Sequence, residues 1–134
     1  MSPHGKIAAL ARRRDRGALS LTYVVILPVV FLFLASVIQA SFWFLARDAA
    51  LAAARQGADA ARAAGSSMTA GHAAAMSFAR QAGGGFLLQP SASVRPAGAA
   101  TVSVTVSGHV PSFVPGLDVN VHETVLAPVE VFRS

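Results

Sequence analysis

Hydrophobic and polar positions follow three successive patterns along the chain, and the first is an apolar run. No charged residue lies between Arg16 and Arg47, a stretch of 30 residues. A helix needs about 20 apolar residues to cross the hydrocarbon core of a bilayer. The pattern therefore predicts a transmembrane helix over residues 18–45.

The second pattern is an alanine-rich segment over residues 46–64, which is free of proline and has a high helix propensity. Neither glycine nor proline separates it from the apolar run, so we expect one helix from Ala18 to about Ala64 that continues outside the membrane. A second, short helix is predicted over residues 68–81, after the break at Gly65-Ser66-Ser67 and before three consecutive glycines at 83–85.

The outer part of the long helix has two different faces. Asp48, Arg55, Asp59 and Arg62 share one face, on which Arg55 and Asp59 are spaced to form an ion pair. The opposite face is nearly smooth and consists of Ala50, Ala53, Ala54, Gly57 and Ala61. A smooth face permits close packing, either against the chain's own domain or against neighbouring copies.

The third pattern is an alternation of period two, which is typical of strands with one buried face. It predicts strands over residues 86–94, where Pro90 weakens the pattern, and over 101–106 (TVSVTV). Valines at odd positions from 119 to 131 predict a third strand, interrupted by Glu123 and Pro128, after a turn over residues 111–116 (PSFVPG). The expected fold is membrane-anchored α+β: a basic leader (1–17), the spanning helix (18–45), an extracytoplasmic helical region (46–82) and a small antiparallel sheet of about three strands (86–134) packed on the helix.

The charge distribution orients this arrangement. The formal net charge is +5, and the excess lies in the leader, whose basic residues are Lys6, Arg12, Arg13, Arg14 and Arg16. A basic block beside a spanning segment places that end in the cytoplasm, so we expect a single-pass protein of the cytoplasmic membrane, in contact with lipid, with its C-terminal region outside. No basic patch interleaved with aromatic residues follows, which argues against nucleic acid as a partner.

Catalytic and metal-binding patterns are weak. The chain has no cysteine, which excludes disulfides and thiolate chemistry. His109 and His122 are the nearest candidates for a metal pair, with Glu123 adjacent, but solvated strand residues are the preferred interpretation. We therefore expect no enzyme activity, no cofactor and no metal.

The junction of leader and apolar run distinguishes several classes of exported protein. A secretory signal has a shorter apolar region than this one, and cleavage after Ala40 would place Ile38 at a position that prefers a small residue. In type IV prepilins, by contrast, a basic leader ends in glycine and the apolar helix begins at once. The Gly17-Ala18 pair resembles that junction, at which the cut falls before the helix.

Further motifs are similar to those of the TadE-like proteins, minor pseudopilins of Tad (Flp) pilus and secretion systems. Arg16-Gly17 matches the pair that precedes the family's apolar segment, Tyr23 stands at its phenylalanine position, and Pro28 stands at its proline position. Residues 53–58 (AARQGA) resemble the family's AAREGA stretch, and the C-terminal VSGHVPSFVPG and PVEVFR resemble the ends of some members.

The resemblance implies cleavage after Gly17 by a prepilin peptidase and a non-enzymatic role in assembly. Its partners would be that peptidase, other pilin-like subunits and an inner-membrane assembly platform, and a surface filament is one place where the protein could be incorporated. An uncut, signal-anchored envelope protein with a small binding domain and a domain secreted after cleavage near Ala40 are the alternatives.

One departure from the family concerns Thr22, which stands where the family has glutamate. In the prepilin class that carboxylate is thought to pair with the free amine of a neighbouring subunit. A threonine hydroxyl supplies a hydrogen bond but no charge, and it can instead bond the carbonyl of Ala18. We therefore expect a subunit that caps or initiates a filament, or that acts in the membrane, rather than a repeating pilin.

Other polar or helix-breaking residues within the span have two interpretations each. Pro28 is either tolerated in a spanning helix or loosens it for filament packing. Gln39, with Ser36 and Ser41, contacts either a partner helix or backbone carbonyls.

Overall fold

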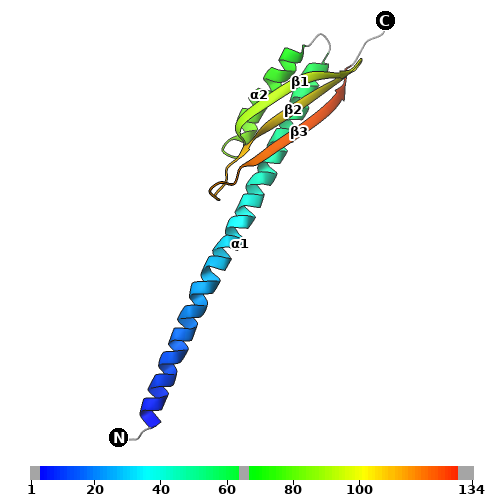
Figure 1. The fold of residues 1–134 in the computed structure, drawn as a ribbon. Helices are drawn as coiled ribbons and strands as arrows, with labels where there is room; N and C mark the ends of the chain where they lie inside the picture. The colour runs from blue at the N-terminus through cyan, green and yellow to red at the C-terminus, as the bar shows by residue number, and fades with distance from the viewer. Residues whose placement is uncertain (1–3, 64–66, 130–134) are drawn as a thin grey trace. The chain divides into compact units, whose positions relative to one another are not determined.

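The computed structural model describes residues 4–63 and 67–129, with side chains from residue 15 onward. Along the chain it contains α1 (His4–Arg62), α2 (Met68–Gly83), β1 (Leu88–Gly98), β2 (Thr101–Val110) and β3 (Val119–Pro128) (Figure 1). The chain divides into two compact units, Met1–Val37 and Ile38–Ser134, which are described separately below. The predicted α+β class, with one long apolar helix, one short helix and a three-stranded antiparallel sheet, is confirmed.

Helix α1 begins earlier than the sequence pattern indicated, at His4 rather than Ala18. The segment between these residues is rich in alanine and arginine, which favour helix, and Gly5 and Gly17 each cost only about 1 kcal/mol relative to alanine. The helix ends at Arg62, and the expected end at Ala64 lies outside the described residues. Helix α2 runs to Gly83 and so ends within the glycine triplet, as predicted.

The sheet is an antiparallel meander in the order β1-β2-β3. In β2 the valines at even positions are buried, while the serines and threonines between them are partly exposed. Strand β3 pairs with β2 in an unbroken register from Thr101↔Pro128 to Val110↔Val119. The predicted third strand is therefore present over Val119–Pro128, whereas Val131 lies outside the described residues.

Strand β1 differs from its prediction at both ends, since it covers Leu88–Gly98 rather than residues 86–94. The amides of Phe86 and Leu87 instead donate to the Gly83 carbonyl, at 2.8 and 3.1 Å, and form a turn at the end of α2. Pro90 and Pro96 are accommodated because β1 is an edge strand whose register shifts between Leu88 and Ser91 and between Pro96 and Gly98.

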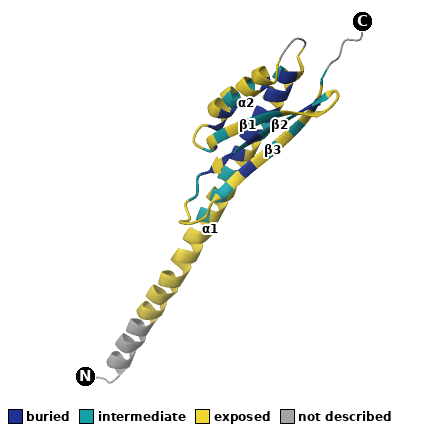
Figure 2. Ribbon diagram, turned by 45° about the horizontal axis from the view of Figure 1, so that its top comes forward, coloured by how far each residue is buried: buried dark blue, intermediate teal, exposed yellow. Residues whose placement is uncertain are grey.

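The core of the second unit is made of small residues on the helices and valines on the sheet, with both helices on one face of the sheet (Figures 1 and 2). The whole smooth face of α1 is buried in it, which confirms packing against the chain's own domain (Ala50, Ala53, Ala54, Gly57 and Ala61). A Cβ placed on Gly57 would lie 2.7 Å from the Cβ of Ala75 and 2.9 Å from the carbonyl oxygen of Gly71. Helix α2 therefore crosses α1 at a distance that only glycine permits.

Charged residues of α1 form two ion pairs that the sequence did not indicate. Asp59 pairs with Arg62 at 2.8 Å, so the prediction that it pairs with Arg55 is wrong. The pair is local, at spacing i,i+3, and both side chains are exposed. The Nε of Arg47 donates to Oε1 of Glu123 at 2.7 Å. Glu123 lies on the inner face of β3 with the apolar residues, and it interrupts their alternation where it pairs with this arginine of the helix.

Candidate processing and assembly site

The predicted processing site lies on α1, within the first unit. The backbone of the leader arginines Arg12, Arg13 and Arg14 is helical, and their side chains lie outside the described part. Arg16, Gly17 and Ala18 are exposed. A Cβ placed on Gly17 would meet no atom within 4 Å, so packing within the chain does not require glycine here.

Thr22 lies one turn after this junction, and its hydroxyl has a partner within the helix. Its Oγ1 donates to the carbonyl oxygen of Ala18 at 2.8 Å. This is the bond expected if Thr22 serves its own helix rather than a neighbouring subunit. The hydroxyl supplies no negative charge, so the position cannot neutralise an amine as a carboxylate does.

Tyr23 and Pro28 complete the predicted set and also lie on α1. Tyr23 is 68% exposed, and Pro28 is inside the helix. No other described helix or strand belongs to this unit, so the five predicted residues Gly17, Ala18, Thr22, Tyr23 and Pro28 are brought together only by their order along one helix.

Apolar side chains surround this site on every side of the helix. The large hydrophobic residues between Leu19 and Val37 are between 45% and 68% exposed. Among the described residues, α1 is the one helix that is long and apolar enough to cross a membrane. Such a surface requires a cover of lipid or of other apolar helices.

Gln39 bonds backbone groups of its own chain, which is one of the two alternatives that the sequence left open. Its Nε2 donates to the Pro111 carbonyl at 3.0 Å, and its Oε1 accepts from the Phe113 amide at 3.2 Å. The ring of Phe42, one turn later, lies 5.4 Å from that of Phe113. An amide side chain within the apolar run indicated that Gln39 has a hydrogen-bond partner. The sequence pattern did not indicate that this partner is the backbone of a segment more than 70 residues away.

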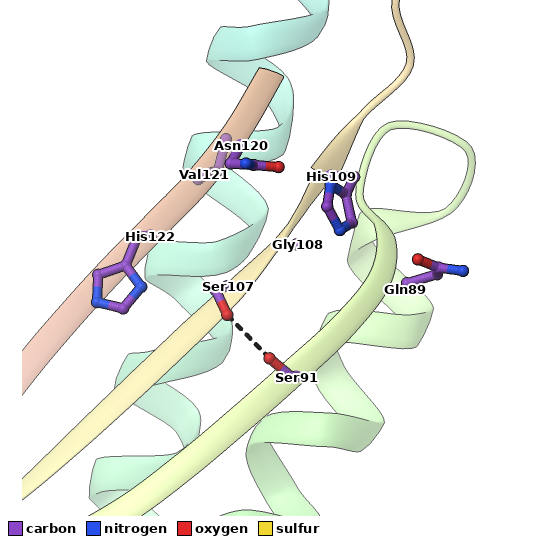
Figure 3. Close-up of a pocket in the computed structure, with 8 residues that line it drawn as sticks. All are labelled: Gln89, Ser91, Ser107, Gly108, His109, Asn120, Val121 and His122. Atoms are coloured by element: carbon purple, nitrogen blue, oxygen red, sulfur yellow. Dashed lines mark hydrogen bonds between the residues drawn. The ribbon is translucent and has the colours of Figure 1, made fainter. Parts of the chain in front are cut away.

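The exposed face of the sheet carries an open polar hollow, drawn in Figure 3. At its centre the hydroxyls of Ser91 and Ser107 are bonded at 2.8 Å. His109 Nδ1 lies 3.2 Å from a carboxylate oxygen of Asp118, and His122 stands opposite Ser107 on β3. Across the described part of the chain, no three histidine, aspartate or glutamate side chains gather as metal ligands do.

Comparison with known proteins gives one match. The sequence model of a family described as TadE-like protein matches residues 17–59, which begin at Gly17 and extend along α1 to Asp59. The resemblance inferred from the sequence is therefore confirmed over this segment. No curated protein and no solved structure matches the chain.

Proposed function

From the match of residues 17–59 to the TadE-like proteins, we propose that this chain is a minor pseudopilin of a Tad-type pilus or secretion system. The family implies an association with the Tad pilus. The finer assignment is that the leader is removed after Gly17 by a prepilin peptidase and that α1 anchors the Ile38–Ser134 unit outside the cytoplasmic membrane. The role is assembly rather than catalysis.

The observation that carries this proposal is the junction at Gly17. Charge ends at Arg16, and the apolar, exposed part of α1 begins at once. Glycine within a helix is unfavourable by about 1 kcal/mol relative to alanine. None of the described residues packs against Gly17, so their packing provides no reason for glycine at this position. A peptidase that needs close access to the backbone provides one.

The same junction supports the proposed orientation, whereas the partners are those that the resemblance to the TadE-like proteins implies. Four arginines close to the start of the span, Arg12, Arg13, Arg14 and Arg16, favour a cytoplasmic leader. The exposed apolar surface of α1 would contact lipid before assembly and the helices of other pilin-like subunits after assembly. An inner-membrane platform would pass the subunit from one environment to the other.

Thr22 favours a second candidate function. Its hydroxyl bonds Ala18 within the helix and supplies no charge for a neighbouring subunit. A chain that is never cut needs no such charge, because it has no new amine at residue 18. The second candidate is therefore an uncut, single-pass envelope protein whose outer unit binds a partner.

Intact mass of the full chain, produced with and without a prepilin peptidase, separates the two. We expect loss of residues 1–17 only when the peptidase is present, and no loss from the Gly17→Val variant. The Gly85→Val variant is the matched control, because a Cβ at Gly85 also meets no atom within 4 Å. A full-length wild-type chain in both samples would favour the uncut anchor, and loss of about 40 residues would favour secretion.

A further inference from the structure

The loop between β2 and β3 exposes a concentrated apolar tip. Phe113, Val114 and Leu117 are 60%, 51% and 46% exposed. Residues 110–117 (VPSFVPGL) contain no charged side chain, and His109 and Asp118 flank the segment. Large apolar side chains that lie together on a surface typically mark a contact with a partner or with lipid.

This tip has a defined conformation. The Leu117 amide donates to the Val114 carbonyl at 3.1 Å, and Gly116 has a φ of +81°. With proline at the second position and glycine at the third, these are the features of a type II turn. Ser112 adds a local bond, since its Oγ accepts from the Val114 amide at 3.2 Å. The apolar side chains are therefore presented by an ordered turn, which reduces the entropy lost when they are covered.

Gln39 and Phe42 hold the loop against α1. Both hydrogen bonds of Gln39 reach the loop backbone, and the Phe42 and Phe113 rings are in contact. Phe44 and Leu45, two and three residues after Phe42 on the helix, are 56% and 47% exposed. The loop and this part of the helix thus form one apolar, uncharged end of the Ile38–Ser134 unit.

The length of the apolar run matches the thickness of a bilayer. Residues 18–38 would span about 31 Å as a helix, close to the roughly 30 Å of the hydrocarbon core. The 28 residues of 18–45 would span about 42 Å, which matches the whole bilayer with its headgroups. A hydrocarbon core that began at residue 18 would therefore end near Gln39, and Phe44 and Leu45 would lie among the headgroups.

We propose that the β2–β3 loop is a lipid-binding element that inserts Phe113, Val114 and Leu117 into the outer leaflet of the bilayer that α1 spans. The loop and helix would together fix the depth of the Ile38–Ser134 unit, with the apolar core ending at Gln39. Aromatic and aliphatic side chains without charge are those favoured at this interface. The proposal rests on the membrane anchoring assumed in the proposed function.

Depth-dependent quenching tests the proposal on the full chain. The protein has no cysteine, so single substitutions can be labelled with an environment-sensitive fluorophore. Val114→Cys and Leu117→Cys report on the loop, and either suffices if the other fails to fold. Leu32→Cys on α1 is the control for the apolar run. Leu126→Cys is the control for an apolar residue away from the loop, because Leu126 lies on β3 and is 64% exposed. The chain is reconstituted in phosphatidylcholine vesicles with and without nitroxide-labelled acyl chains.

We expect the nitroxide lipid to quench the label at residues 114, 117 and 32 and to leave the label at 126 unquenched. A loop label that behaves like residue 126 while residue 32 is quenched would overturn the insertion of the loop and leave the anchor intact. Shielding that appears only at high protein density, without quenching by lipid, would overturn it in favour of contact between copies. An unquenched label at residue 32 would contradict the anchor itself, and the proposed function with it.

Discussion

At the scale of single residues, two glycines of α1 occupy opposite environments. Gly57 lies at the crossing with α2, where a side chain would meet Ala75 and the Gly71 carbonyl at under 3 Å. Gly17 has no neighbour within 4 Å of a Cβ position. The first glycine is therefore required by packing, whereas no described residue makes packing a reason for the second.

This contrast gives a prediction for alanine at each position. Gly57→Ala should destabilise the Ile38–Ser134 unit by about 1–3 kcal/mol, because overpacking against backbone outweighs the gain in helix propensity. The matched control Gly17→Ala should leave the stability of this unit unchanged. Thermal unfolding of the full chain in detergent, followed by the fluorescence of Trp43, measures both. An unchanged unfolding midpoint for Gly57→Ala would contradict the close crossing of the helices.

At the scale of elements, side chains of α1 connect the helix to the middle of β3 and to the loop that precedes this strand. Arg47 bonds Glu123 within the strand, and Gln39 bonds the loop that precedes the strand. The ion pair is partly exposed, so its contribution is small and falls with salt. The amide bonds are therefore expected to contribute more to the order of the loop.

Removal of the amide tests this expectation. In Gln39→Ala the Phe113 amide should exchange its hydrogen faster, because its acceptor is lost, and the unit should lose about 1 kcal/mol of stability. Ser36→Ala, which removes a bond to the Leu32 carbonyl within the helix, should leave the loop unchanged. Hydrogen exchange of the full chain in detergent, read at residues 111–117, compares the two. Equal exchange in both variants would mean that the loop is held by other contacts.

At the scale of the whole molecule, the proposed subunit differs from a repeating pilin in one charge. After cleavage, an ammonium group at residue 18 within lipid would be costly unless it were compensated. Thr22 offers no compensation, and its hydroxyl is already bonded to Ala18. A subunit of this kind would add poorly behind others in a filament, which suits a capping, initiating or membrane-resident role.

A carboxylate at residue 22 should change that behaviour. Thr22→Glu should raise the fraction of processed chain that is recovered with sheared filaments, because the carboxylate can pair with the amine of a neighbour. Ser20→Glu is the control, since it adds the same charge at another exposed position of α1. Immunoblots of sheared and cell-bound fractions measure the ratio. An unchanged ratio, or an equal rise in both variants, would count against the role of residue 22.

Much of the fold was predictable because it depends on local periodicity. The uncharged run over residues 17–46 indicated the long apolar helix, and the valine alternation of residues 101–106 indicated β2 with its buried face. The glycines at 83–85 indicated the end of α2. Each of these patterns acts within a few residues, so the sequence by itself determined which elements form and which of their faces are apolar. The resemblance at the Gly17 junction is likewise local.

Only the tertiary structure decided which distant residues meet. The smooth face of α1 was also suited to a neighbouring copy, and its partners proved to be α2 and the sheet. Gln39 is hydrogen-bonded to the backbone of the β2–β3 loop, and Glu123 is hydrogen-bonded to Arg47. The physical reason is that such contacts depend on strand register, on the helix crossing and on packing within a fraction of an ångström, none of which leaves a periodic trace in the chain.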